Sequence, residues 1–220
     1  MNIGGFVKNS FVDYPGLISS VIFTNGCNYN CWYCHNKSLI HSGVNQVDFN
    51  EIIRFLETRK GLIDAVVFSG GEATLQPDLE EKIIQIKNMG YKIKLDTNGT
   101  NPKILENLLA KNVLDYVAMD IKTSANNYEK ITISSSLINN VLESIKILLD
   151  SKIDYEFRTT VSPDINVDDI IAICELIKGT KKYYLQKCNL ENQKGYSKEE
   201  LLNLLEVAKS IIPSTELRNL

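Results

Sequence analysis

The chain alternates short, continuously apolar segments with longer segments in which apolar residues recur every three or four positions. The short segments are rich in β-branched and aromatic residues, as are strands buried on both faces of a parallel sheet. The longer segments are typical of amphipathic helices, and the first of them places Phe49, Ile52, Ile53 and Leu56 on one face. The predicted strands are 18–24, 65–69, 92–96, 116–121, 155–160 and 183–186.

Helix start and stop signals agree with this alternation. Asn101-Pro102 supplies an N-cap and a proline at the first helical position, while Gly90 and Gly179 lie where helices should end. Ser197 and Glu200 form a capping box before an apolar run. Six strand–helix units imply a parallel sheet with right-handed crossovers, and no Gly-x-Gly-x-x-Gly follows the first strand. We therefore predict an α/β fold, an incomplete (β/α)6 TIM-like barrel.

Residues 1–16 precede the repeating units and carry a turn sequence, Asp13-Tyr14-Pro15-Gly16. They predict an N-terminal extension, a short strand or hairpin that folds back before the first unit. No linker or low-complexity tract interrupts the units that follow, and 220 residues are enough for one substantial core. The sequence thus predicts a single domain over residues 1–220.

Polar residues follow each predicted strand at its carboxyl end. The carboxyl ends of parallel barrel strands share one face, where active sites lie. Six polar clusters at six strand ends should therefore meet at one mouth. These clusters are 27–36, 69–72, 96–99, 120–122, 158–160 and 186–188.

The first cluster contains Cys27, Cys31 and Cys34 in a Cys-x3-Cys-x2-Cys spacing. A buried helix face is disfavoured by the glycine and asparagines around them, and a disulfide by the odd total of five cysteines. A structural zinc site could use His35 as the fourth ligand, but no second ligand pair follows. Three thiolates on a cubane iron–sulfur cluster would leave one iron open to another ligand, and the spacing favours this interpretation.

The cysteine spacing, with the aromatic Tyr33 before the last cysteine, resembles the signature of the radical S-adenosylmethionine (SAM) enzymes. The continuation Cys34-His35-Asn36 resembles the branch that activates glycyl radical enzymes, and the LDTNG and MDIK segments bring the chain closest to activators of anaerobic ribonucleoside-triphosphate reductase. The resemblance covers essentially the whole chain. It implies a radical SAM type of barrel whose three cysteines hold a [4Fe–4S] cluster that chelates SAM. It also implies reductive cleavage of SAM to a 5′-deoxyadenosyl radical, which takes a hydrogen atom from a glycine of the partner enzyme.

The resemblance also implies the residues that contact SAM. Gly70-Gly71-Glu72 matches the motif that binds the SAM amino group, although Ala73 replaces the family's proline and the two glycines are equally typical of a tight turn. The other family positions lie at the ends of the third to fifth strands, in some members around a monovalent cation. The implied cofactor-binding residues are Tyr33, Gly70, Gly71, Glu72, Asp96, Thr97, Asn98, Asp120 and Lys122, and the implied catalytic residues are Lys122 and Arg158.

Three further positions have no secure role in this scheme. A V-D-x-P-G segment similar to one in the activases places Asp13 near the active face. Cys174 has the helical spacing of a core residue, whereas Cys188 at the end of the sixth strand remains ambiguous. Neither cysteine could complete a second cluster, and no ferredoxin-like insertion follows the cysteine loop, so electrons should come from a separate flavodoxin or ferredoxin.

Charge and the lengths of apolar runs indicate which partners and which cell compartment to expect. The net charge is −3 with basic residues dispersed, which gives no footprint for nucleic acid. No apolar run reaches membrane-spanning length and no signal peptide is evident, so we expect a cytoplasmic protein with no membrane association. Two other functions stay open: a small-molecule radical SAM enzyme similar to a deazapurine synthase, and a non-enzymatic iron–sulfur or zinc module.

Overall fold

The structure, a computed structural model, describes residues 1–40, 46–132, 137–188 and 195–218. Its contacts divide the chain into two compact units. The first unit comprises residues 1–28, 36–97 and 103–117, and the second comprises residues 29–35, 98–102 and 118–220. Within the described residues, no helix combines the length and the apolarity needed to span a membrane.

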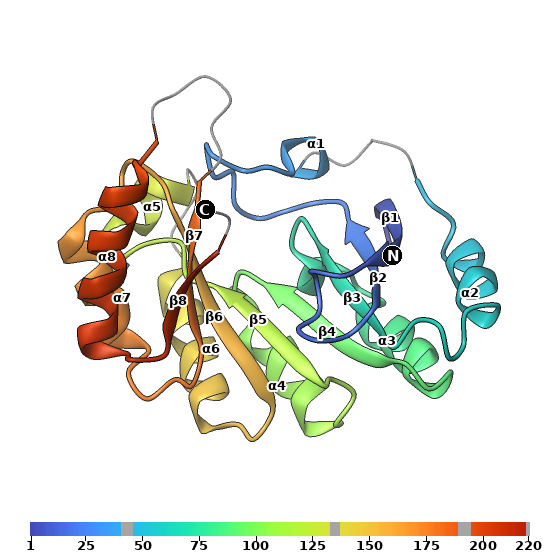
Figure 1. Cartoon of the computed structure of the whole chain (residues 1–220). Helices are drawn as coiled ribbons and strands as arrows, with labels where there is room; N and C mark the ends of the chain where they lie inside the picture. Colours follow the sequence, from blue (N-terminus) through green and yellow to red (C-terminus); the bar gives the residue numbers. More distant parts are fainter. Residues whose placement is uncertain (41–45, 133–136, 189–194, 219–220) are drawn as a thin grey trace. The chain divides into compact units, whose positions relative to one another are not determined.

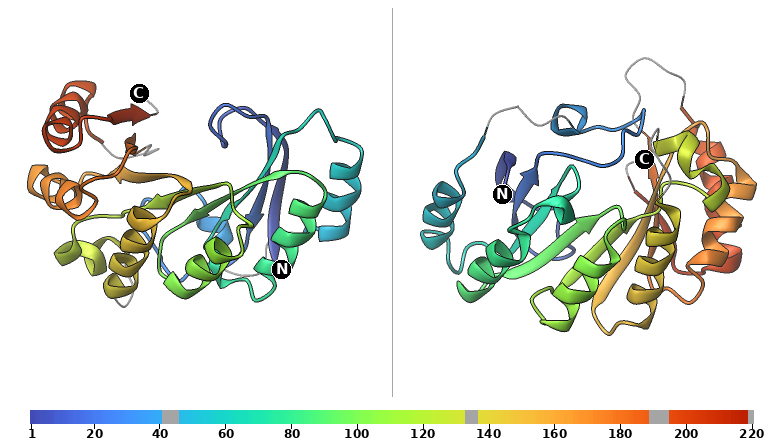
Figure 2. Two further views of the ribbon diagram at one scale, coloured as in Figure 1. Left: turned by 90° about the horizontal axis from the view of Figure 1, so that it is seen from below. Right: turned by 180° about the vertical axis from the view of Figure 1, so that it is seen from behind.

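Among its described residues, the first unit contains four strands in the order β1 to β4, and β1 runs antiparallel to β2 while β2, β3 and β4 are mutually parallel. Figure 2 shows β1 and β2 side by side. The strands are β1 Ile3–Ser10, β2 Ser19–Thr24, β3 Ala65–Gly70 and β4 Lys92–Thr97. The helices of this part are α1 Lys37–Ile40, α2 Phe49–Glu57, the 3-10 turn η1 Ala73–Leu75, α3 Leu79–Asn88 and α4 Pro102–Ala110.

The described part of the second unit holds three further parallel strands in sequence order, and its helices α7 and α8 pack against each other (Figure 1). Strand β5 Tyr116–Asp120 begins in the first unit and ends in the second. The remaining strands are β6 Asp154–Val161, β7 Tyr183–Lys187 and β8 Thr215–Arg218. The helices are the 3-10 turn η2 Ala125–Asn127, α5 Tyr128–Thr132, α6 Ile138–Asp150, α7 Val167–Leu176 and α8 Lys198–Ile211.

All six predicted strands are present, within two residues of the predicted bounds. Helix α4 begins at Pro102 as predicted, and Ser197 forms the capping box with Glu200. Gly90 and Gly179 have φ values of 98° and 94°, the left-handed conformation typical of the residue after a helix. These local signals were correct because each depends on only a few neighbouring residues.

The sequence pattern missed several short elements, among them a strand and a helix. Strand β8 has four residues, too few to show a period, and α1 is a single turn placed directly after the cysteine loop. The position expected for Asp13 was also wrong. Ser10 pairs with Ser19 at the start of β2, so Asp13 lies at the amino end of β2, opposite the cysteine loop. There its carboxylate accepts a hydrogen bond from the Ser10 hydroxyl at 2.5 Å and builds a turn.

The interior of each unit is apolar along its strands and along one face of each long helix. In the first unit, Tyr14, Val21, Ala65, Val67 and Tyr116 form one buried cluster. In the second, α6 buries Val141, Ile145 and Leu148. Each fully buried side chain of this size contributes roughly 1.5–3 kcal/mol, so these faces supply the stability on which the polar strand ends depend.

Candidate functional site

The start of the cysteine loop is fixed to the Gly70-Gly71-Glu72 turn of the first unit. The Gly71 N–H donates to the Thr24 carbonyl, and the Glu72 N–H donates to the Gly26 carbonyl, both at 2.8 Å. A Cβ atom on Gly70 would overlap the Thr24 backbone, and one on Gly71 would overlap the Gly26 carbonyl. The two glycines are therefore required by the close approach of two backbone segments.

Glu72 is fully buried and joins this turn to the end of β4. Its Oε1 atom accepts hydrogen bonds from the Thr74 N–H at 3.1 Å, the Thr74 hydroxyl at 2.5 Å and the Thr97 hydroxyl at 2.8 Å. Glu72 and Thr97, both predicted at the site, are thus brought together. This hydrogen bond joins two side chains of the protein to each other, and a direct contact of either with SAM stays a prediction.

Asp96 lies beside a buried lysine that sequence reasoning did not select. The Lys94 ammonium pairs with Asp96 Oδ1 at 2.5 Å, and the Ser69 hydroxyl donates to Asp96 Oδ2 at 2.9 Å. Lys94 is almost completely buried, which is rare for a lysine and is possible here because a carboxylate pairs with it. The sequence did contain a signal for this pair: Lys94 and Asp96 are two positions apart in one strand, and alternate residues of a strand share one face.

In the second unit, the ends of β5 and β6 bring together three charged residues that were all predicted at the site. Asp120 pairs through Oδ2 with the Lys122 ammonium at 3.0 Å and through Oδ1 with Arg158 Nε at 2.8 Å. The side chains of Asp120, Lys122 and Arg158 are only 28%, 16% and 13% exposed. Two cations therefore share one carboxylate in a largely desolvated place.

The electrostatics of this charge cluster follow from burial and close pairing. Burial alone would raise the pKa of the Asp120 carboxyl, but the Arg158 and Lys122 cations outweigh it and hold that pKa well below its usual range. Burial would lower the pKa of Lys122, and the Asp120 carboxylate more than reverses this. All three residues of the cluster are therefore charged at neutral pH.

Cys31 and Tyr33, in the part of the cysteine loop that belongs to the second unit, are close enough to Lys122 for its charge to affect their pKa values. Burial raises the pKa of the Cys31 thiol, and the Lys122 cation opposes that increase. Burial likewise raises the pKa of Tyr33, and its hydroxyl is buried without a hydrogen-bond partner among the described residues. A buried unsatisfied hydroxyl next to a cation is a feature expected where another group is to bind.

The donor chemistry of the three cysteines fits a thiolate-ligated cluster. None of them forms a disulfide, and cysteine sulfur is the ligand that iron–sulfur clusters select. Cys27 belongs to the first unit, and Cys31 and Cys34 belong to the second. In the described part of the chain, no three His, Cys, Asp or Glu side chains are arranged to hold a metal ion, so the three cysteines as cluster ligands stay a prediction.

The other predicted positions have structural roles of their own. The Asn98 carboxamide oxygen accepts from the Thr100 N–H at 3.0 Å and from its hydroxyl at 2.7 Å, and forms the turn after β4. A side chain on Gly99 would overlap Met119. Cys174 is a core residue of α7, where burial raises its pKa to about 12, and the buried Cys188 shows the same direction of change.

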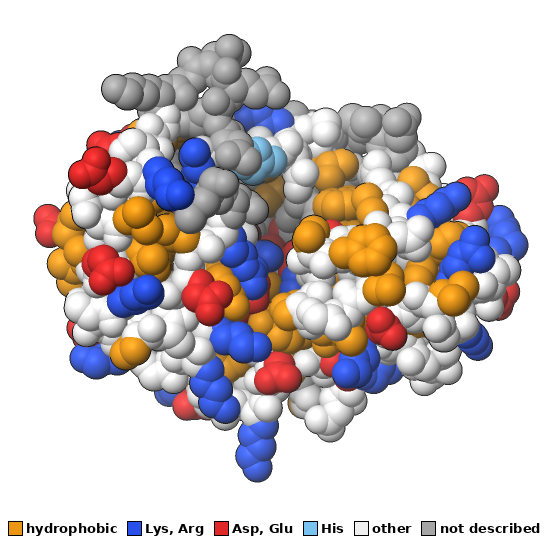
Figure 3. Space-filling model, in the orientation of Figure 1, with side chains coloured by type: hydrophobic (Ala, Val, Ile, Leu, Met, Phe, Trp, Pro, Cys, Tyr) orange, Lys and Arg blue, Asp and Glu red, His pale blue; other side chains and the backbone are white. Residues whose placement is uncertain are grey.

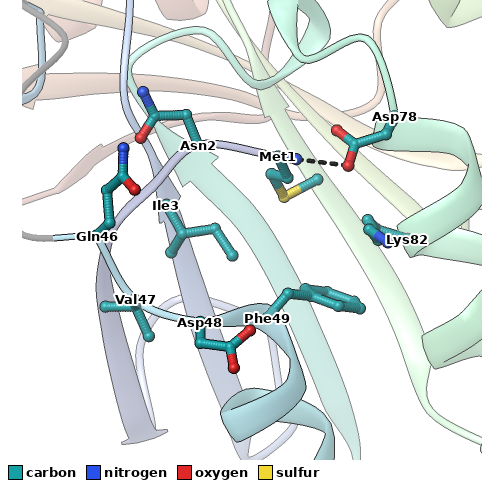
Figure 4. Close-up of a pocket in the computed structure, with 9 residues that line it drawn as sticks. All are labelled: Met1, Asn2, Ile3, Gln46, Val47, Asp48, Phe49, Asp78 and Lys82. Carbon is teal, nitrogen blue, oxygen red and sulfur yellow. Dashed lines mark hydrogen bonds and ion pairs between the residues drawn. The ribbon is translucent and has the colours of Figure 1, made fainter.

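A pocket elsewhere in the first unit contains none of the predicted site residues (Figure 4). The Met1 ammonium pairs there with Asp78 at 2.5 Å, and the Lys82 ammonium lies 4.9 Å from the centre of the Phe49 ring. The Asn2 N–H donates to Gln76, which in turn donates to the Asn25 carbonyl just before the cysteine loop. The N-terminal residues thus support the start of that loop.

The fold and the cysteine loop define a class of protein. Residues 21–177 match the sequence profile of the Radical SAM superfamily, and the chain belongs to this superfamily. Membership implies a [4Fe–4S] cluster and SAM as cofactors, and it confirms the predicted α/β fold of the radical SAM type. On the face shown in Figure 3, basic and acidic side chains are interspersed.

Several known proteins are similar to this chain in sequence or in fold. A protein of Methanocaldococcus jannaschii, provisionally named a glycyl-radical enzyme activating enzyme, is 32% identical across 99% of this chain and 96% of its own length. The pyruvate formate-lyase-activating enzyme of Clostridium pasteurianum is 35% identical across 50% of this chain and 48% of its own. The structure of Streptococcus suis SuiB bound to the precursor peptide SuiA shares the fold, with a TM-score of 0.72, 16% identity and coverage of 90% of this chain and 48% of that one.

Proposed function

We propose that this protein activates a glycyl radical enzyme. The observation that carries the proposal is the similarity along the full length to a protein named as such an activating enzyme. The reaction is one-electron reductive cleavage of SAM to methionine and a 5′-deoxyadenosyl radical, followed by transfer of a hydrogen atom from a glycine of the partner to that radical. Cys27, Cys31 and Cys34 would hold the [4Fe–4S] cluster, and the reduced cluster would supply the electron.

The charge cluster at the ends of β5 and β6 supports this assignment. A largely desolvated cation strengthens any interaction with an anionic ligand, and SAM carries a carboxylate. We assign the contact with that carboxylate to Lys122, which is near Cys31, and a role in orienting bound SAM to Arg158. The remaining SAM contacts in this proposal are Tyr33, Gly70, Gly71, Glu72, Asp96, Thr97, Asn98 and Asp120, with a monovalent cation held by carboxylates among them.

The partner in this proposal is an anaerobic ribonucleoside-triphosphate reductase, and the electron donor is a cytoplasmic flavodoxin or ferredoxin. The partner assignment rests on the resemblance of the LDTNG and MDIK segments to activators of that enzyme. A glycine-containing loop of the partner would exclude water from the radical, as a radical enzyme requires.

Electron paramagnetic resonance of the reduced protein with SAM and the reductase tests this function. The expected result is a glycyl radical doublet that requires all three components. A matched control replaces Cys31 by alanine, because this change removes one cluster ligand and should abolish the signal. If no glycyl radical enzyme gives a doublet and a small metabolite consumes the radical instead, the small-molecule function replaces the activase.

A further inference from the structure

Trp32 lies between the second and third cysteines and contacts a distant part of the second unit. Its indole Nε1–H donates a hydrogen bond to Asp164 Oδ2 at 2.8 Å, across 132 positions of sequence. The acceptor is a carboxylate, and hydrogen bonds to charged groups are about twice as strong as neutral ones. Trp32 is the sole tryptophan of the chain, and neither it nor Asp164 is among the predicted ligand, cofactor-binding or catalytic residues.

The loop that carries Asp164 is firmly held. Its neighbour Ile165 is fully buried and its carbonyl accepts a hydrogen bond from the Tyr196 hydroxyl at 2.6 Å. The following residue, Asn166, forms a capping box with Asp169 at the start of α7. Asp164 is therefore an acceptor in a fixed position, and its hydrogen bond restrains the position of the Trp32 indole.

The cysteine loop has a second attachment to the same region. The Asn30 N–H donates to the Thr132 carbonyl at the end of α5 at 2.8 Å, and the Tyr29 ring lies 6.2 Å from that of Tyr128. On the other side of Asp164, the Lys130 ammonium of α5 lies 3.6 Å from Oδ1. Attachments on both sides of Cys31 thus constrain a segment whose asparagine-rich sequence has little preference for regular structure.

We propose that Asp164, acting through the Trp32 indole, is a positioning residue that holds Cys31 and Cys34 in place for the cluster. An unrestrained loop would have to be ordered when the cluster binds, whereas a loop already held in place avoids that entropic cost. The inference rests on the cluster implied by the superfamily. It does not depend on which substrate receives the radical.

The first test measures how fast a chelator removes iron from the anaerobically reconstituted full-length protein. Asp164→Ala and Trp32→Phe should each accelerate iron loss about tenfold, which corresponds to about 1.4 kcal/mol. The double variant should be no faster than either single variant, because both changes remove one interaction. Asp164→Asn keeps an acceptor oxygen and should stay within about threefold of the wild type.

Two control variants separate the hydrogen bond from charge. Asp168→Ala removes an exposed carboxylate four residues further along and should leave iron loss unchanged. Lys130→Met removes the exposed cation beside Asp164 and should do the same. Wild-type iron loss in Asp164→Ala, additive effects in the double variant, or equal damage from Asp164→Asn and Asp164→Ala would each overturn the proposal.

A second readout does not need the cluster. Fluorescence of the full-length protein before reconstitution reports Trp32 alone. Asp164→Ala should shift its emission to the red and raise its quenching by acrylamide, with circular dichroism unchanged, whereas Asp164→Asn should resemble the wild type. Unchanged quenching in Asp164→Ala would show that the indole is held by other contacts and would contradict the proposal. A failure to activate any glycyl radical enzyme would leave both readouts intact and would count only against the proposed function.

Discussion

The two units build their parts of the candidate site from different interactions. In the first unit, Gly70 and Gly71 allow two backbones to approach, and Glu72 bonds to Thr74 and Thr97. In the second unit, charged side chains build the site: Lys122 and Arg158 each pair with Asp120, and Lys122 acts on the pKa of Cys31. The close backbone approach at Gly70 and Gly71 leaves no space for a Cβ atom. The charge cluster at the ends of β5 and β6, by contrast, responds to pH and to an anionic ligand. We therefore expect the turn of the first unit to be a rigid support, and in the proposed function the charges of the second unit are the part that responds to SAM.

The largest expected effect comes from adding one methyl group to the support. Gly71→Ala would force its Cβ against the Gly26 carbonyl. Overpacking of this kind typically costs about 1–3 kcal/mol, and we expect the upper end here because the neighbour is backbone. Gly5→Ala is the matched control, because its Cβ would meet its nearest neighbour, Phe23, at an ordinary 3.7 Å. Urea unfolding should show a loss of about 3 kcal/mol for the first variant and little change for the second. Equal unfolding free energies for Gly71→Ala and Gly5→Ala would show that the turn is not a rigid support.

The next effect depends on pH and belongs to the charge cluster. Asp120→Asn leaves two cations facing each other, and we expect a loss of about 2 kcal/mol, below the cost of breaking a fully buried ion pair because Asp120 is 28% exposed. The folded-state pKa of Asp120 is lowered, so its contribution is complete above the unfolded-state pKa of about 4 and is lost as pH falls through the folded-state pKa. The stability difference from the wild type should therefore be largest at neutral pH and shrink below about pH 4.

A surface ion pair provides the control for that pH series. Glu175 and Lys178 pair at 3.2 Å with both side chains more than half exposed. Exposed pairs contribute about 0–1 kcal/mol, so Glu175→Gln should change stability little at any pH. A pH-independent loss in Asp120→Asn would indicate that packing around Asp120, and not its charge, stabilises the fold.

Lys122→Met should affect binding more than folding. If Lys122 contacts the SAM carboxylate, its removal should weaken SAM binding by at least about thirtyfold, which corresponds to the lower end of the 2–5 kcal/mol typical of buried charge pairs. Isothermal titration of the cluster-loaded protein measures this, and iron content should stay at the wild-type level. Lys178→Met removes an equivalent but exposed charge and should leave SAM affinity unchanged. An unchanged affinity in Lys122→Met would remove that residue from the site.

The smallest effect concerns a pair that sequence reasoning missed. Arg218 of β8 binds the buried Glu156 through two hydrogen bonds of 2.6 and 2.9 Å, and its guanidinium lies 3.4 Å from the centre of the Tyr184 ring. Arg218→Lys keeps the charge but loses the planar, bidentate contact. We expect a loss of about 1 kcal/mol in unfolding free energy, typical of one hydrogen bond, with no change in SAM affinity. A change in SAM affinity would extend the functional cluster to β8.

How much could be predicted from sequence depends on the range of the interactions concerned. The strands, Pro102 at the start of α4 and the Ser197 capping box follow from neighbouring residues and were predicted correctly. Asp120, Lys122 and Arg158 could be placed together because parallel strand ends share a face. The contacts of Trp32 with Asp164 and of Arg218 with Glu156 join residues 132 and 62 positions apart, and no local pattern signals them. Asp13 was misplaced because a resemblance of motif carries no information about which end of a strand it occupies.

In the proposed function, the 5′-deoxyadenosyl radical acts on a glycine of another protein. The most direct measurement uses an anaerobic ribonucleoside-triphosphate reductase in which glycine is deuterated at Cα, incubated with the reduced protein and unlabelled SAM. Mass spectrometry should find one deuterium in 5′-deoxyadenosine, in proportion to the glycyl radical formed, and none with the Cys31→Ala variant. Unlabelled 5′-deoxyadenosine in the presence of a glycyl radical, or deuterium-free product without any radical on the reductase, would contradict the claim.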